Sequence, residues 1–124
     1  MMYLDTHIIL WLYEGLRDRL TPKANDYLER HELIISPMVY LEMQYLHEIK
    51  RVAPTASTMT DYLIANLGLT ICNESFVQIA YAASKMDWTR DPFDRLIVAN
   101  AKIREALILT KDEMIHQHYR HAIW

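Results

Sequence analysis

Short apolar segments alternate with longer helical segments along the whole of this chain. The helical segments are long enough to serve as crossover connections, so successive strands are expected to run in the same direction. This pattern predicts an α/β fold, a three-layer α/β/α sandwich built on a mainly parallel five-stranded sheet. The expected strands cover residues 2–5, 33–36, 67–72, 107–110 and 121–124.

Three of the expected helices begin where a capping residue precedes a proline, at Thr21-Pro22, Ser36-Pro37 and Asp91-Pro92. The capping side chain accepts a hydrogen bond from a free backbone N–H of the first turn, and proline has no N–H that would be left unpaired there. The expected helices cover residues 7–13, 22–30, 37–51, 57–66, 73 or 74–86, 92–105 and 112–118.

The chain of 124 residues contains only two glycines and four prolines, and no linker or repeat. We therefore predict one domain over residues 1–124. The longest apolar run, residues 8–13, is far shorter than the roughly 18 residues of a membrane span, and the N-terminus lacks a signal-peptide pattern. A cytoplasmic location is expected. The single cysteine, Cys72, cannot form an internal disulfide and is expected to be a small apolar residue in a strand.

The net charge of −3 lacks the basic excess that is typical of nucleic-acid-binding proteins. Metal ions that neutralised four carboxylates would change it to +1, so RNA binding would depend on a local patch. Such a patch is equally well explained as solvated surface charge. Its candidate residues are Arg90, Arg95, Lys102, Arg104 and Lys111.

Two acids follow expected strands directly. Asp5 ends the first strand and Asp112 follows the fourth. In an open parallel sheet, ligands bind beyond the carboxyl ends of the strands, where the strand order reverses. Each acid also has a structural explanation, because Asp5 and Asp112 can both cap the helices that follow them.

Glu42 is expected on the apolar face of a helix. Its neighbours at helical spacing are Met38, Tyr45, Leu46 and Ile49. A buried carboxylate is costly unless it is paired or binds a metal ion. Glu42 therefore has no simple structural explanation.

Asp94 also has apolar neighbours three and four positions later, Ile97 and Val98. With Asp91 as the cap and Pro92 as the first helical residue, Asp94 lies in the first turn, where an acid favours the helix dipole. Capping thus explains the start of this helix but not the burial of Asp94.

These four carboxylates can converge on one point if their strands are neighbours. Oxygen ligands of this kind suit Mg²⁺ or Mn²⁺ rather than Zn²⁺. Such ions beside a phosphate activate water and stabilise the leaving oxygen, which is nuclease chemistry. A set of unrelated helix caps and surface acids remains the alternative on spacing alone.

The acids lie within longer segments that match a known family. These are Leu4-Asp5-Thr6-His7 with Trp11-Leu12, Ser36-Pro37 with Glu42, Asp91-Pro92-Phe93-Asp94-Arg95-Leu96-Ile97-Val98-Ala99-Asn100-Ala101, and Leu109-Thr110-Lys111-Asp112. Together they resemble the PIN-domain toxins of the VapC type. The likeness covers nearly the whole chain in order, as far as Ile123-Trp124.

The resemblance implies a parallel five-stranded sheet flanked by helices. It also implies Mg²⁺- or Mn²⁺-dependent endonuclease activity on single-stranded regions of RNA, and a cognate antitoxin protein that blocks the site. By position, the acids that bind metal in the family are Asp5, Glu42, Asp94 and Asp112.

Three further positions match the family. Asp91 is an additional acid that either caps its helix or binds a second metal ion. Thr6 and Thr110 match residues that support the acids by hydrogen bonds. Of the basic residues, Arg90, Arg95 and Lys111 are the candidates for RNA contact.

The histidines and aromatic residues have less specific patterns. A zinc site at His116, His118 and His121 lacks further ligands at suitable spacing. His7 either touches RNA or packs. Aromatic residues at helical spacing either stack on bases or form the core and a homodimer interface. They are Trp11, Tyr40, Tyr45, Tyr62 and Tyr81.

Two other functions are consistent with parts of the pattern. One is an RNA-binding or scaffold protein that keeps the fold without cleaving. The other is a phosphotransfer domain or phosphatase, which also uses an aspartate after the first strand. The aspartyl phosphatases need a second aspartate two positions later, where this chain has His7.

Overall fold

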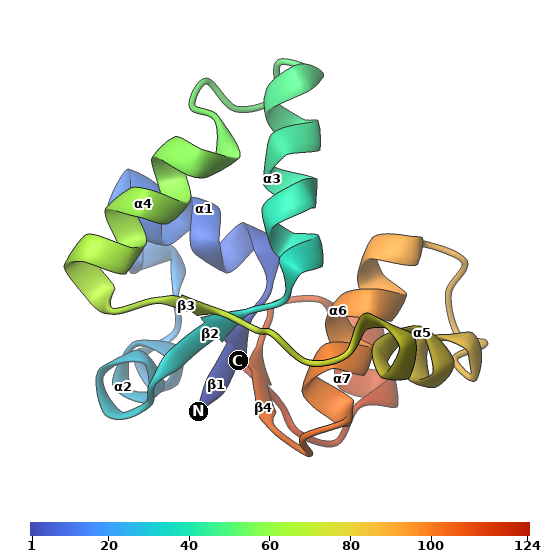
Figure 1. The fold of residues 1–124 in the computed structure, drawn as a ribbon. Helices are drawn as coiled ribbons and strands as arrows, with labels where there is room; N and C mark the ends of the chain where they lie inside the picture. The colour runs from blue at the N-terminus through green and yellow to red at the C-terminus, as the bar shows by residue number, and fades with distance from the viewer.

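Five strands form the central sheet of the computed structural model, which describes all of residues 1–124 (Figure 1). They are β1 (Met2–Leu4), β2 (Leu33–Ile35), β3 (Thr70–Ile71), β4 (Leu107–Leu109) and β5 (Ala122–Ile123). Their order in the sheet is β3-β2-β1-β4-β5, and every neighbouring pair is parallel. The predicted α/β fold is confirmed, with a sheet that is parallel throughout.

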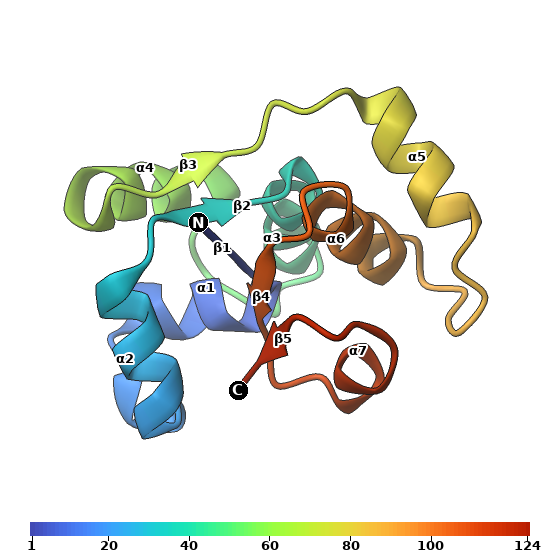
Figure 2. The same cartoon turned by 90° about the horizontal axis from the view of Figure 1, so that it is seen from below.

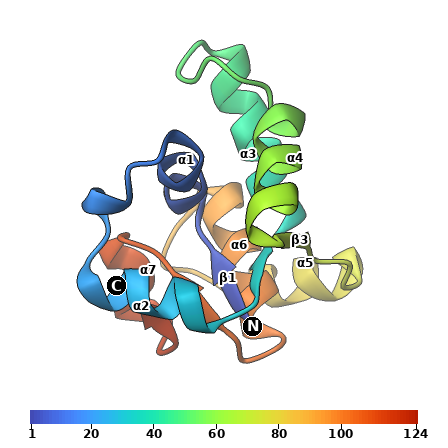
Figure 3. The ribbon, with the colours of Figure 1, turned by 90° about the vertical axis from the view of Figure 1, so that its left-hand side faces the viewer.

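Seven helices and one 3₁₀ turn surround the sheet. They are α1 (Thr6–Glu14), η1 (Arg17–Arg19), α2 (Pro22–Arg30), α3 (Pro37–Glu48), α4 (Ala56–Leu67), α5 (Phe76–Ser84), α6 (Pro92–Lys102) and α7 (Glu113–His118). Helices α1, α2 and α4 cover one face, and α5, α6 and α7 cover the other (Figures 1 and 3). Helix α3 follows β2 and contacts both α4 and α6. This is the predicted three-layer sandwich.

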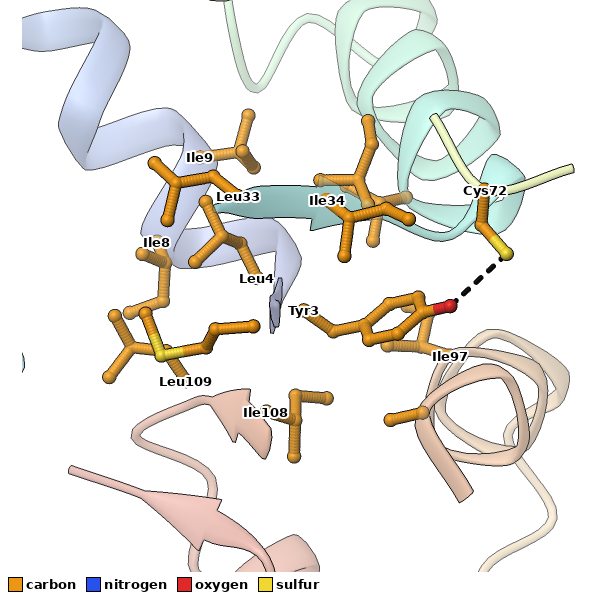
Figure 4. Close-up of a cluster of buried hydrophobic side chains, with 14 of the residues drawn as sticks. Tyr3, Leu4, Ile8, Ile9, Leu33, Ile34, Cys72, Ile97, Ile108 and Leu109 are labelled. Carbon is orange, nitrogen blue, oxygen red and sulfur yellow. Dashed lines mark hydrogen bonds between the residues drawn. The ribbon is translucent and has the colours of Figure 1, made fainter. Parts of the chain in front are cut away.

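The central strand β1 is buried on both faces (Figure 4). Met2, Tyr3 and Leu4 are at most 1% exposed. A parallel strand covered by helices on both sides carries a continuous apolar run rather than an alternating one, which explains this segment. Because β1 pairs with β4 and Leu4 lies opposite Leu109, the residues that follow these two strands emerge side by side.

The strand predicted at residues 67–72 is mostly wrong. Helix α4 continues to Leu67, and β3 includes only Thr70 and Ile71. Gly68 ends the helix in the left-handed conformation, with φ of +66°, and this leaves little chain for the strand. The apolar character of this segment comes from the buried Leu69 and Cys72 rather than from a long strand.

Several helix boundaries also differ from those expected. Helix α3 ends at Glu48 rather than at residue 51, α4 begins at Ala56 rather than at residue 57, and α6 ends at Lys102 rather than at residue 105. Helix α5 is shorter at both ends than the predicted 73 or 74–86. Its start is set by Ser75, whose hydroxyl accepts a hydrogen bond from the Gln78 N–H.

Cys72 lies just beyond β3 and does more than fill space. It is 4% exposed, and its Sγ is 3.1 Å from the Tyr3 hydroxyl and 3.0 Å from Asn100 Nδ2, both of which donate to it. The expectation of a merely apolar residue in a strand is therefore corrected. No helix in the structure is both long and apolar enough to cross a membrane.

Candidate metal-binding acidic site

All five acids singled out in the sequence line one cavity of about 480 Å³. The cavity lies beyond the carboxyl ends of β1 and β4. These are the two neighbouring strands between which the strand order reverses. Helices α1, α3, α6 and α7 begin around it. The residues that line it are Asp5, His7, Ile8, Trp11, Glu42, Asp91, Asp94, Lys111 and Asp112.

Asp5 lies between β1 and α1 and has a partner for each carboxylate oxygen. Oδ1 accepts from the Thr6 N–H at 2.8 Å, and Oδ2 accepts from the Thr110 hydroxyl at 2.6 Å. Asp5 is therefore the N-cap of α1 as well as a wall of the cavity. Burial raises the pKa of this carboxyl above its usual value, despite both hydrogen bonds.

Asp112 has the same double role at the end of β4. Its Oδ1 accepts from the Ile115 N–H at 3.0 Å and caps α7. The Thr110 hydroxyl that donates to Asp5 also accepts from the Asp112 N–H at 3.0 Å. Thr110 is completely buried, so one hydroxyl fixes both strand-end acids relative to each other.

Glu42 enters the cavity from α3, where the Thr6 hydroxyl donates to its Oε1. Burial, followed by the negative charges of Asp5 and Asp91, raises the pKa of Glu42. The expected apolar face is only partly confirmed: Met38 and Leu46 pack against the core, but the other two expected neighbours do not. Tyr45 and Ile49 are 47% and 45% exposed, and the face of α3 that enters the core is formed by its buried residues Val39 and Met43. Glu42 is half-buried because the neighbouring elements surround it.

Asp94 is the least satisfied acid of the cavity. It is half-buried on α6, and its carboxylate accepts no hydrogen bond from the protein, whereas Asp91 accepts from the Phe93 N–H at 2.9 Å and caps the helix. Burial, followed by repulsion from the four other acids, raises the pKa of Asp94 to about 7. A cation placed among these acids would remove that repulsion.

Among the predicted basic residues, only Lys111 lines the cavity. Arg90 and Arg95 instead donate to the carbonyls of Asp87 and Thr89, in the loop before α6. The structure does not bring these two arginines into the site. They hold the loop that carries Asp91.

Of the histidines considered in the sequence, only His7 lines the cavity. His7 is exposed and lines the cavity, with its ring centroid 6.3 Å from that of Trp11. His116 and His118 form hydrogen bonds with the carbonyls of Thr110 and Met114, and no metal cluster includes them.

The family profile described as the PIN domain matches residues 2–121. The chain belongs to the PIN-domain family. No curated protein matches it. Solved structures share the PIN fold at low sequence identity, and three of them are described below.

The first is VapBC2 from Rickettsia felis bound to a DNA fragment from its promoter, with a TM-score of 0.70 and 17% identity over 99% of this PIN domain and 96% of that chain. The second is a toxin–antitoxin complex from Klebsiella pneumoniae. Its TM-score is 0.69 and its sequence identity is 17%, over 100% of this chain and 97% of that chain. The third is VapBC-1 from nontypeable Haemophilus influenzae. Its TM-score is 0.58 and its sequence identity is 19%, over 100% of this chain and 96% of that chain.

The donor set of this PIN domain fits a hard divalent cation. No group of three or more Asp, Glu, His or Cys side chains is arranged to hold an ion by direct contact alone. Mg²⁺ usually keeps several of its waters and binds through one or two carboxylates, which suits a cavity lined by spaced acids. Burial is the main cause of the raised pKa values of Asp5, Glu42 and Asp94, and repulsion from the neighbouring acids adds to it.

The metal-free protein is expected to lose stability as the pH rises. The pKa of Asp94 is about 7 in the folded state, against 3.8 for a free aspartate, so the folded state binds the proton more tightly. Stability from this group is complete below about pH 4 and is lost between about pH 4 and 7. In EDTA, Asp94→Asn should therefore increase the free energy of unfolding at pH 8 by about 1–2 kcal/mol, after allowing for partial solvent exposure.

Thermal unfolding at pH 5 and pH 8 measures this effect. The gain at pH 8 should disappear at low pH, and Mg²⁺ should stabilise the native protein more than the variant. An Asp94→Asn variant that is less stable than the native protein at pH 8 in EDTA would contradict the expected repulsion. Asp61→Asn, an exposed acid on α4, provides the matched control.

Proposed function

We propose that this protein is a Mg²⁺- or Mn²⁺-dependent endoribonuclease that cuts single-stranded regions of RNA. The observation that supports it is the convergence of Asp5, Glu42, Asp94 and Asp112 in one cavity at the carboxyl edge of the sheet. Asp91 joins them at the rim. Isolated helix caps would have no reason to share a cavity in which Asp94 is repelled by all the others.

The side chains of the cavity would have different roles in hydrolysis. A bound divalent ion supplies a water of lowered pKa and positive charge for the leaving oxygen. Asp5, Glu42, Asp94 and Asp112 would hold such an ion. The hydroxyls of Thr6 and Thr110 keep the carboxylates of Glu42 and Asp5 in orientation, because both threonines are buried and cannot turn away.

The biological role proposed is that of the toxin in a toxin–antitoxin pair that acts in the cytoplasm. The similar solved structures are described as toxin–antitoxin complexes, and the fold matches theirs along the whole chain. A cognate antitoxin would silence the enzyme by covering the acidic cavity. The reading frame upstream of this gene should encode a short protein of DNA-binding type, and co-expression of that protein should block cleavage.

Cleavage of defined RNA tests the enzymatic proposal. Purified protein is incubated with labelled single-stranded RNA and with the matched duplex, in Mg²⁺, in Mn²⁺ and in EDTA. We expect products only from the single strand and only with metal. Binding of RNA without products in either metal would instead support the non-cleaving RNA-binding alternative.

We also propose a homodimer that forms through α5. Val77 and Tyr81 are 56% and 67% exposed and lie on one face of this helix, because positions four apart are neighbours, and Phe76 at the start of the helix is 61% exposed. Helix α3 has a second such stripe at Leu41, Tyr45 and Ile49. Exposed apolar residues gathered on one helix face indicate a protein contact more often than single ones do.

An acidic residue at position 81 should dissociate the dimer. Tyr81→Asp places a charge in the proposed interface, which we expect to weaken dimerisation about 100-fold or more. Sedimentation at several concentrations measures the change, and Ala65→Asp on the exposed face of α4 is the control. The interface would lie elsewhere if both variants dimerised as the native protein does.

A further inference from the structure

A second hollow adjoins the acidic cavity, and Lys111 lines both of them. The second hollow has a volume of about 570 Å³ and lies along α7. Its other lining residues are Glu113, His116, Gln117 and Trp124, of which only the tryptophan is apolar. This composition does not suit an apolar ligand. It suits a planar polar group whose face can stack on the tryptophan and whose edge can form hydrogen bonds.

Aromatic rings connect the two hollows. His7 and Trp11 line the acidic cavity, and Trp124 lines the second hollow. The ring centroids of His7 and Trp11 are 6.3 Å apart, and those of Trp11 and Trp124 are 6.2 Å apart. The two pairs are tilted by 55° and 48° rather than stacked face to face. Trp124 follows β5, in the part of the molecule shown near the C label in Figure 2.

Lys111 and Gln117 have no side-chain partners in the protein. Lys111 is exposed and takes part in none of the four ion pairs of the structure. Gln117 is exposed, and its amide makes no hydrogen bond, so both its donor and its acceptor are free. By contrast, His116 is engaged with the Thr110 carbonyl at 2.8 Å. The free groups therefore comprise one cation between the hollows, and one amide together with the exposed Glu113 carboxylate in the second.

We infer that the second hollow binds an unpaired base of the RNA strand whose phosphate lies in the acidic cavity. Trp124 provides the stacking face, Gln117 contacts the base edge, and Lys111 binds the phosphate that links this nucleotide to the scissile one. The inference rests on the proposed function for the place of the scissile phosphate. A duplex cannot use this hollow because its bases are paired and stacked, so the hollow gives a physical reason for single-strand preference.

Two substitutions at Trp124 test whether a base stacks on its ring. Trp124→Leu keeps an apolar side chain against Trp11 but has no π face, whereas Trp124→Phe keeps an aromatic ring. Binding of a fluorescent single-stranded decanucleotide RNA is measured by anisotropy in EDTA, which prevents cleavage. Because stacking on one aromatic side chain contributes about 1–3 kcal/mol, Trp124→Leu should weaken binding about 5- to 100-fold, and Trp124→Phe should retain most of it.

The charge and edge contacts have their own readouts. Lys111→Gln should weaken binding of all sequences alike and reduce the salt dependence of log Kd by about 1. Lys85→Gln, at an exposed lysine outside both hollows, should change neither. Gln117→Ala should alter the preference among homopolymeric RNAs while leaving the salt dependence unchanged. Thermal unfolding confirms that each variant is folded.

The outcomes separate this inference from the enzymatic proposal. If Trp124→Leu binds RNA as tightly as the native protein does, the base site is wrong, whether or not the native protein cleaves. If the native protein does not bind single-stranded RNA at all, the inference also fails. If Trp124→Leu loses binding and Trp124→Phe keeps it, while no metal supports cleavage, then the base site stands and the nuclease proposal fails.

Discussion

Replacing Asp94 with asparagine is expected to lower metal-dependent RNA cleavage by about 100-fold or more. Even residues that only support a metal ligand change affinity or activity 10- to 100-fold, so loss of a ligand charge should have at least this effect. Asp94 is the acid that lacks any hydrogen-bond partner and has a pKa raised to about 7. Asparagine has nearly the same shape and keeps the fold, but it cannot provide the negative charge. Initial cleavage rates at saturating Mg²⁺ measure the effect.

The neighbouring acids give matched controls for this experiment. Asp5→Asn should lose activity to the same degree. Asp91→Asn should keep the cap of α6, because asparagine caps helices as well as aspartate does. Full activity of Asp91→Asn would assign Asp91 to capping, and a loss would assign it to a second metal ion. Cleavage that persists equally in Asp5→Asn and Asp94→Asn would rule out the acidic cavity as the active site.

Removing the hydroxyl of Thr110 should weaken metal binding by about 10- to 100-fold, although Thr110 itself carries no charge. In Thr110→Val, the Asp5 Oδ2 loses its donor at 2.6 Å and the Asp112 N–H loses its acceptor at 3.0 Å. Asp5 then keeps only the hydrogen bond from the Thr6 N–H, and the backbone at Asp112 is no longer tied to residue 110. Leaving these buried groups unpaired should also lower the free energy of unfolding by about 1–3 kcal/mol.

Manganese affinity, measured by titration calorimetry, separates these two effects. Thr110→Ser keeps the hydroxyl and should bind the metal nearly as well as the native protein does. Stability alone does not distinguish the roles, because any change at a completely buried residue is felt in folding. Native metal affinity in a less stable Thr110→Val protein would show that Thr110 is structural only.

The pattern of apolar segments determined most of the fold before any contact was known. β1, β2, β4 and β5 lie within their expected ranges. For β1, β2 and β4 the reason is that a strand covered by helices on both faces is a continuous apolar run. The pairs Thr21-Pro22, Ser36-Pro37 and Asp91-Pro92 all begin helices as expected. Local capping chemistry thus placed the helix starts more reliably than the helix ends.

The segment around Gly68 shows where local patterns were insufficient. Leu67, Leu69 and Cys72 are all apolar, yet the first ends a helix, the second is buried in the link between α4 and β3, and the third follows a short strand. Apolar residues in so short a run fit a helix end or a strand equally well. Only packing against β2 decided where β3 begins.

The sequence by itself determined which acids are present and that two of them follow strands. It did not determine why Glu42 is half-buried, because Tyr45 and Ile49, which suggested an inward face, point to solvent. The tertiary structure decided this through the Thr6 hydroxyl, which joins the start of α1 to α3. Residues 36 positions apart share a hydrogen bond only after β1 and β2 have paired, and no local pattern contains that information. The same pairing places Asp5 beside Glu42, and the pairing of β1 with β4 adds Asp112.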